Sequence, residues 1–257
     1  MSQTVRYEVN SRIAIVTLDR PAQRNAVDAA MTAALRAAMD RFEADPEALV
    51  AILTGSGDRA FCAGMDLKAF AAGEGPAILE GPGGFAGFTH YRRTKPCIAA
   101  VNGAALGGGC ELVLACDLVV AAEHARFGFP EVTRGLFAVS GGVLRLPRLI
   151  PRARALELLL TGDLVDAKTA FELGLLNRVV PQGQVLPAAR DLARRIGANA
   201  PLAVRETLAL ARAVFALPEE HLQARSDAAW ARVAASEDAR EGPRAFAEKR
   251  PAVWQGR

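Results

Sequence analysis

The amino-acid sequence predicts an α/β fold followed by a helical C-terminal region. Strand-like apolar runs alternate with segments of helical period as far as about residue 184. Beyond that point the strand-like runs stop, and segments of helical period are separated by prolines: Pro187, Pro201, Pro218 and Pro243. With 257 residues the chain is long enough to bury a sizeable core. We therefore expect a core domain over residues 1–190 and a helical region over residues 191–257.

The N-terminal part of the core predicts a hairpin and a helix. Residues 5–9 and 13–18 are strand-like and flank the turn Asn10-Ser11. Asp28 is a suitable N-cap for the helix that follows. The apolar residues of this helix recur at helical spacing and should be buried: Met31, Leu35, Ala38, Met39 and Phe42.

The rest of the core repeats this alternation. Strands are expected at residues 48–54, 97–102 and 117–122, and helices at residues 151–160 and 166–174. The second of these helices has Asp166 as its N-cap and Gly174 as its stop. Between the strands expected at 48–54 and 97–102, residues 69–88 are rich in glycine and alanine and contain two prolines, which predicts a mobile surface loop.

Composition excludes several classes of protein. Hydrophobic residues make up 51% and charged residues 23% of the chain, as in ordinary globular proteins. The formal net charge of +3, without a basic cluster, argues against a nucleic-acid partner. The N-terminus lacks the pattern of a secretory signal, and no apolar run has the roughly eighteen residues that a membrane span needs.

The cysteines indicate a reducing compartment. The sequence has four, none in a CxxC pair, and each has apolar neighbours: Cys62, Cys97, Cys110 and Cys116. We expect packed, reduced thiols and a cytoplasmic protein. The three histidines are scattered without metal-ligand spacing, so no metal site is expected.

Two catalytic motifs are matched only superficially. Gly55, Gly57 and Ala60 fit a dinucleotide-binding fingerprint, but no helix start follows them, so we interpret them as a turn after a strand. Ser140 precedes two glycines but lacks the first glycine of a nucleophile elbow.

The glycine run at residues 107–109 is the strongest local signal. If a helix begins there, the N–H groups near Gly108 and Gly109 belong to its first turn and lack acceptors within the helix. Bare backbone with the positive end of a helix dipole is suited to a phosphate or an oxyanion. Glu111 follows in the first turn, where it serves either catalysis or simply the helix dipole.

Two further stretches have a similar character. Residues 60–67, AFCAGMDL, place small residues between Phe61 and Asp66 and could present another backbone N–H. In residues 127–135, Pro130 precedes Glu131 among aromatic residues, where burial would raise the carboxyl pKa. The alternative for Glu131 is an ordinary carboxylate at a helix start.

Several longer motifs resemble the crotonase superfamily, that is, the enoyl-CoA hydratase/isomerase family. They follow the family's order over nearly the whole chain: DRPAQRNAVD (19–28), AFCAGMDLKAF (60–70), the segment 95–131 with GGGCE and FPE, GGVLRLPR (141–148), LTGDLVDAKTAFELGLLNRVV (160–180) and EGPRAFAEKRP (241–251). The resemblance implies a crotonase-like spiral of ββα units with a C-terminal helical trimerisation region. It also implies homotrimers, often paired as hexamers, an acyl-CoA thioester substrate, and no separate cofactor.

The resemblance assigns roles to four residues. The backbone N–H groups of Ala63 and Gly108 would form an oxyanion hole for the thioester oxygen. Glu111 and Glu131 would be the catalytic carboxyl groups, with Glu131 the main proton donor and Glu111 the residue that orients water.

The resemblance also implies contacts to the CoA and acyl groups. The candidate residues are Arg24, Ala26, Phe61, Asp66, Leu67, Lys68, Phe137, Ser140, Phe246 and, from a neighbouring subunit, Lys249. For the lysines and the arginine the alternative is a solvated side chain on an exposed helix.

The activity is expected to be enoyl-CoA hydration, with two alternatives. The segment 135–147, GLFAVSGGVLRLP, departs from the usual hydratase pattern and looks closer to carnitinyl-CoA dehydratases. One alternative is therefore another crotonase lyase or isomerase of that kind. The other is a non-catalytic acyl-CoA-binding trimer.

Overall fold

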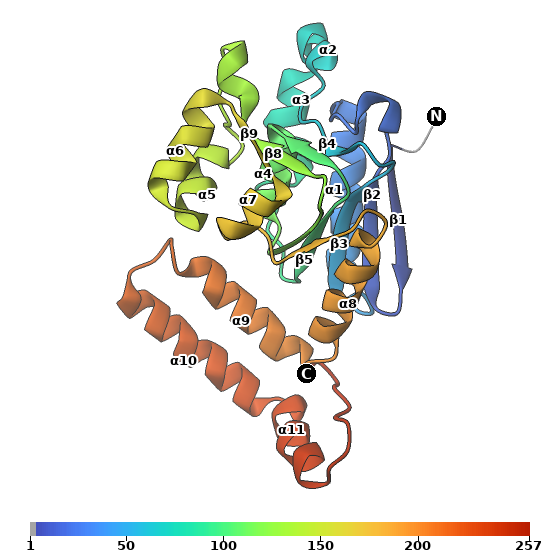
Figure 1. Cartoon of the computed structure of the whole chain (residues 1–257). Coiled ribbons are helices and arrows are strands. Elements are labelled where there is room, and N and C mark those ends of the chain that lie inside the picture. Colours follow the sequence, from blue (N-terminus) through green and yellow to red (C-terminus); the bar gives the residue numbers. More distant parts are fainter. Residues whose placement is uncertain (1–3) are drawn as a thin grey trace.

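Two β-sheets form the centre of the computed structural model, which describes residues 4–257 (Figure 1). The six-stranded sheet has the order β1-β2-β3-β5-β7-β10, and the four-stranded sheet has the order β4-β6-β8-β9. The first comprises β1 (Val5–Asn10), β2 (Ile13–Leu18), β3 (Val50–Gly55), β5 (Cys97–Val101), β7 (Leu118–Ala122) and β10 (Arg178–Val180). The second comprises β4 (Ala60–Cys62), β6 (Ala104–Leu106), β8 (Arg126–Gly128) and β9 (Leu164–Asp166).

A two-strand unit repeats along the chain. β3, β5 and β7 pair in parallel in the large sheet, and the strand after each, β4, β6 or β8, pairs in parallel in the small sheet. Each pair of strands is followed by helical structure before the chain returns to the large sheet. The helices are α2 (Leu67–Ala69) with α3 (Gly75–Leu79), then α4 (Gly108–Ala115), then the 3-10 helix η4 (Pro130–Arg134) with α5 (Gly142–Leu149). This winding confirms the predicted spiral of ββα units.

Helices cover both faces of the large sheet. α1 (Ala29–Ala44) buries its five predicted apolar residues on one face, and Asp28 caps it by accepting a 2.8 Å hydrogen bond from the Met31 N–H. On the other face α8 (Val185–Gly197) buries Val185, Ala189 and Ala193 against the strands. The other predicted strands and helices are also present, with ends that differ by a few residues. They include α6 (Arg152–Thr161) and α7 (Ala167–Glu172), which Asp166 caps through the Thr169 N–H.

The prediction for residues 69–88 was wrong. This segment contains a π-helical turn over Phe70–Glu74, α3, and the 3-10 helix η3 (Phe85–Gly87), and η3 packs against α1. Ile78, Phe85 and Phe88 are fully buried. Burial of these three side chains offsets the conformational entropy that the glycines lose on ordering.

The cysteines are free thiols, as predicted. Cys62, Cys97 and Cys110 are buried and Cys116 is half-buried. The Sγ atoms of Cys97 and Cys116 lie 3.8 Å apart. Within residues 4–257 no helix is both long and apolar enough to span a membrane.

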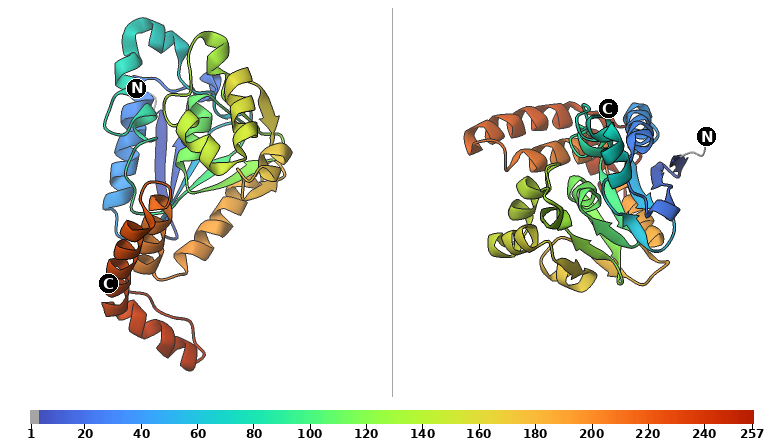
Figure 2. Two further views of the ribbon diagram at one scale, coloured as in Figure 1. Left: turned by 90° about the vertical axis from the view of Figure 1, so that its left-hand side faces the viewer. Right: turned by 90° about the horizontal axis from the view of Figure 1, so that it is seen from above.

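The last three helices form a C-terminal arm, α9 (Pro201–Ala213), α10 (Glu219–Ala235) and α11 (Glu237–Ala247), which extends from one end of the body (Figures 1 and 2). The division of the chain at residue 190 stays a prediction. Because α8 packs on the large sheet, we place the seam after Gly197.

Candidate active site

The glycine run begins helix α4, and each glycine meets a different steric demand. Gly107 precedes the helix with φ +56°, a left-handed conformation that favours glycine. At Gly109 a Cβ would lie 2.0 Å from the Cys62 carbonyl oxygen of β4, and at Gly108 a Cβ would lie 2.5 Å from the ring of Phe85. The first turn of α4 therefore packs so closely against β4 and η3 that a side chain at Gly108 or Gly109 would clash.

One N–H group of this run is left free. The Gly107 N–H donates to the Gly128 carbonyl over 2.9 Å, which ties the run to β8. The Gly108 N–H faces no backbone or side-chain acceptor in residues 4–257, and Gly108 lines a cavity. A free N–H at the start of a helix is a site where an oxygen that carries negative charge is stabilised.

The second predicted donor, Ala63, is corrected by the structure. Its N–H donates to the Arg24 carbonyl over 3.0 Å, so it is not available to a ligand. The next N–H, that of Gly64, lies 3.4 Å from the Cys62 sulfur. Met65 lines the cavity, and its N–H has no acceptor in the described part of the chain. Gly64, at φ +92°, brings this strand so close that a Cβ there would lie 3.2 Å from the Gly108 nitrogen. The free pair of donors is therefore Met65 and Gly108.

Glu111 is held rigidly in the first turn of α4. Its side chain is buried, with 3% of the residue exposed, and Oε1 accepts a 2.9 Å hydrogen bond from the Gly142 N–H at the start of α5. Burial raises the pKa of Glu111 to about 7; the Gly142 N–H opposes this shift and the charge of Glu131 adds to it. A carboxyl group with a pKa near neutrality can both take up and release a proton.

Glu131 enters the same cavity from η4. Its Oε1 atom lies 3.2 Å from the position a Cβ would take on Gly107, so a side chain there would press on the carboxyl group. Its Oε2 atom is buried and has no hydrogen-bond partner in residues 4–257. Partial burial raises the pKa of Glu131, although its own backbone N–H and the Arg134 charge act in the opposite direction. A buried oxygen without a partner indicates a ligand atom or water at this point.

The cavity that unites these groups has a volume of about 290 Å³. Its walls are mainly apolar, and its polar groups are Glu111, Glu131, the two free N–H groups and the side chains of Arg24, Arg134 and Ser140. Such a combination is typical of small-molecule sites. The apolar lining includes Leu67, Phe70, Leu79, Phe85, Leu106, Leu136, Phe137 and Val139.

The other predicted site residues divide into three groups. Arg24, Leu67, Phe137 and Ser140 line the cavity. Phe61 does not, because it is fully buried in the core. The remainder lie outside the cavity within this chain: Ala26, Asp66, Lys68, Phe246 and Lys249.

Asp66 has a structural role instead. Its carboxylate accepts hydrogen bonds from the Lys68 and Ala69 N–H groups and pairs with Arg20 at 3.2 Å. Partial burial opposes the shift, but the Ala69 N–H and Arg20 lower the pKa of Asp66. Asp66 thus caps the N-terminus of α2 and fixes the backbone directly after Met65.

Three residues of the site were not identified from the sequence. Met65 stands in the same motif as Ala63, and only the tertiary hydrogen bonds show which N–H is free. Gly142 lies in the quoted motif GGVLRLPR, but nothing in that motif points to Glu111 as its partner. Phe85 belongs to the segment predicted as a loop, so no signal marked it.

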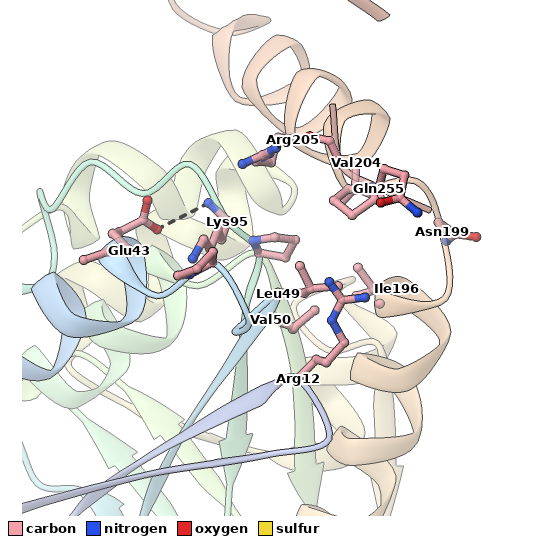
Figure 3. A pocket seen from close by; sticks show the side chains of 16 residues that line it. Arg12, Glu43, Leu49, Val50, Lys95, Ile196, Asn199, Val204, Arg205 and Gln255 are labelled. Carbon is pink, nitrogen blue, oxygen red and sulfur yellow. Dashed lines mark hydrogen bonds between the residues drawn. The ribbon is translucent and has the colours of Figure 1, made fainter. Parts of the chain in front are cut away.

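The cavity drawn in Figure 3 is a different one. It lies between the β1–β2 turn, the end of α8 and the start of α9, and none of the predicted site residues lines it. The ammonium group of Lys95 in this cavity already binds the protein itself, because Nζ donates to the carbonyls of Phe42 and Asp45 over 2.7 and 2.6 Å. The two carboxyl groups therefore mark the other cavity as the candidate active site.

The arrangement suits the chemistry of an acyl carbonyl. Two N–H donors would polarise a carbonyl oxygen and bind an enolate-like oxygen more strongly. Two carboxyl groups at the same cavity could supply the proton donor and acceptor for the adjacent carbons.

Comparisons with known proteins agree with this description. A family model described as enoyl-CoA hydratase/isomerase matches residues 8–257. An enoyl-CoA hydratase structure from Mycobacterium tuberculosis H37Rv is 48% identical, with a TM-score of 0.95 and full coverage of both chains. A carnitinyl-CoA hydratase structure from Mycobacterium avium is 46% identical, with a TM-score of 0.81 and full coverage of both chains. The carnitinyl-CoA dehydratase of Salmonella typhi is 46% identical over all of both chains.

Proposed function

This chain belongs to the enoyl-CoA hydratase/isomerase family, and from that premise we propose that it is a hydro-lyase that adds water reversibly across the 2,3 double bond of a 2-enoyl-CoA thioester. One observation carries the proposal: Glu111 and Glu131 reach one cavity beside the free Gly108 N–H. Hydration needs a base, an acid and an oxyanion site, and these groups supply all three.

The thioester oxygen would accept hydrogen bonds from the N–H groups of Gly108 and Met65. These donors draw electron density from the double bond, so that C3 becomes open to attack by water. As the enolate-like oxygen forms, both hydrogen bonds strengthen, and loss of one such donor typically slows a reaction about a hundredfold to a thousandfold.

The two carboxyl groups divide the proton transfers. Glu111 is fixed by the Gly142 N–H and would orient and activate the water that attacks C3. Glu131 has an oxygen without a partner and would deliver the proton to C2. Dehydration runs through the same groups in reverse, with the acid and base roles exchanged.

The CoA group would bind at the cavity's open edge and through a neighbouring copy of the chain. Arg24 lines the cavity, and Lys68 directly follows Leu67, which lines it too; we propose that both cations approach phosphate groups of CoA. Phe246 is 87% exposed on the C-terminal arm and does not line the cavity of its own chain. We propose a homotrimer, or a pair of trimers, in which Phe246 and Lys249 of one copy reach the CoA of the next.

A second activity has a specific observation in its favour. Three phenylalanines, Phe70, Phe85 and Phe137, line the acyl cavity, and aromatic faces attract quaternary ammonium groups such as that of carnitinyl-CoA. The 46% identical relatives carry the name carnitinyl-CoA dehydratase. The aliphatic residues of the same wall favour a hydrocarbon acyl group, so simple enoyl-CoA hydration remains the leading proposal.

Paired substrates separate these activities. Crotonyl-CoA and crotonobetainyl-CoA are each added to the protein, and the loss of enoyl-thioester absorbance is followed. We expect a higher kcat/KM for crotonyl-CoA. A higher value for crotonobetainyl-CoA would replace the leading proposal with the second. Binding of both without turnover would instead show an acyl-CoA-binding protein that is not an enzyme.

A further inference from the structure

A large cationic cavity lies between the body and the C-terminal arm. Its volume is about 800 Å³, and it is bounded by residues 89–93, the end of α4, α5, and helices α9 and α10. In Figure 1 the arm lies below α5 and α6, which places this cavity on the side of α5 that faces the arm. Six arginines line it: Arg92, Arg93, Arg145, Arg148, Arg212 and Arg225.

The protein neutralises little of this charge. Asp117 is the one carboxylate among the lining residues, and Arg212 already pairs with both of its oxygens at 2.8 and 2.7 Å. Arg92, Arg148 and Arg225 make no ion pair or side-chain hydrogen bond with residues 4–257. Three guanidinium groups therefore face the cavity without an anionic partner from the described chain.

Two further arginines are held in place beside them. Arg145 donates to the carbonyls of Ser140 and Thr89, and Arg93 donates to the carbonyl of Ala115 while its buried Nε has no acceptor in the described chain. Burial lowers the pKa of Arg145; the charge of Glu111 opposes this shift, and the like charge of Arg93 adds to it. Burial also disfavours the charge of Arg93, but nearby groups that include Asp117 and Glu43 raise its pKa. Guanidinium groups held in place beside three unpaired ones are stabilised further when a multiply charged anion binds near them.

We propose that this cavity binds a phosphate group, either as free inorganic phosphate or as the phosphoryl end of a nucleotide. Guanidinium groups bind phosphate oxygens through paired, planar hydrogen bonds, and several of them around one cavity are typical of phosphate recognition. This cavity is separate from the acyl cavity, because no residue lines both of them. It does not depend on which acyl-CoA the active site takes.

Calorimetric titration tests the proposal with two probes, inorganic phosphate and ADP, at low ionic strength. The test variant is Arg92→Gln with Arg148→Gln, because neither side chain has a structural partner. We expect the wild-type protein to bind phosphate and the double variant to bind it about tenfold more weakly or worse. ADP that binds more tightly than phosphate, and whose binding is weakened in the Arg92/Arg148 double variant but not in Arg24→Gln, identifies a nucleotide. Equal affinities for the two probes, both weakened in the double variant, identify free phosphate.

Two control variants guard the interpretation. Arg59→Gln with Arg152→Gln removes the same charge at exposed positions outside this cavity and should leave phosphate binding unchanged. Arg24→Gln tests the CoA end of the acyl cavity. Phosphate binding lost in Arg24→Gln but kept in the Arg92/Arg148 double variant would overturn the proposal. Absence of phosphate binding to the wild type would overturn it too. A double variant that binds phosphate with wild-type affinity would also overturn the proposal. Circular dichroism checks that all variants are folded.

Discussion

At the scale of single residues, the protein holds its two carboxyl groups in different ways. Glu111 is anchored by the Gly142 N–H, whereas Glu131 has an oxygen that meets no donor in the described chain. We expect Glu111→Gln and Glu131→Gln each to lower kcat for crotonyl-CoA hydration about a hundredfold to ten-thousandfold, as for removal of a general acid or base. Absorbance assays measure the loss. Full activity in either variant would contradict the two-carboxylate mechanism.

The buried Glu111 also makes stability depend on pH. Its folded pKa of about 7 lies above the ordinary value of 4.5, so folding favours the protonated form. This contribution is fully present below pH 4.5 and is lost as pH rises through about 7, by at most about 3 kcal/mol. Glu111→Gln keeps the acceptor for Gly142 and removes the titration.

We therefore expect Glu111→Gln to melt several degrees higher than wild type at pH 8, and to show a smaller difference at pH 5. Thermal unfolding followed by circular dichroism at both pH values measures this. The exposed Glu80→Gln is the matched control and should melt like wild type at both. A constant difference between the Glu111 variant and wild type across pH would show that burial of the charge is not the cause.

At the scale of elements, the contact between α4 and β4 positions the site. Gly109→Ala would place a Cβ 2.0 Å from the Cys62 carbonyl, so α4 must move away from β4 and carry Gly108 and Glu111 with it. We expect a loss of stability of about 1–3 kcal/mol and a drop in kcat with it. Urea unfolding and the hydratase assay measure both.

Gly81→Ala is the matched control, since a Cβ there meets nothing within 4 Å. It should leave stability and activity near the wild-type values. If Gly109→Ala behaved like Gly81→Ala, the close approach of α4 and β4 would not be what positions Glu111.

At the scale of the whole molecule, the C-terminal arm has too small a core of its own. The buried apolar residues of α9–α11 are all alanines: Ala213, Ala229 and Ala245. The large side chains of Trp230 and Phe246 are 70% and 87% exposed. Large exposed aromatic residues on an arm indicate a protein interface. We expect the wild-type protein to be a trimer or hexamer.

Substitution Trp230→Ser should weaken that assembly, and light scattering coupled to size-exclusion chromatography measures the mass. Val9→Ser is the control, because Val9 is an exposed apolar residue on the edge strand β1, far from the arm in sequence. A wild-type monomer, or an unchanged mass in Trp230→Ser at dilute concentration, would show that this face of α10 does not hold the assembly.

The sequence alone determined the strands and helices of this protein and part of its candidate active site. The period of the apolar residues and the capping side chains Asp28 and Asp166 predicted strands and helices that the structure confirms, because these signals act over a few residues. The glycine run and Glu111 share one helical turn, so their proximity also followed from the sequence.

Only the tertiary structure decided the remaining features, because they depend on contacts between distant segments. The Arg24 carbonyl takes the Ala63 N–H and leaves that of Met65 free, and no property of the motif reveals this. Residues 69–88 are ordered because Phe85 is buried against α4 and α1. Glu131 lies in the same cavity as Glu111 because β6 and β8 pair in the small sheet, which brings η4 beside the start of α4.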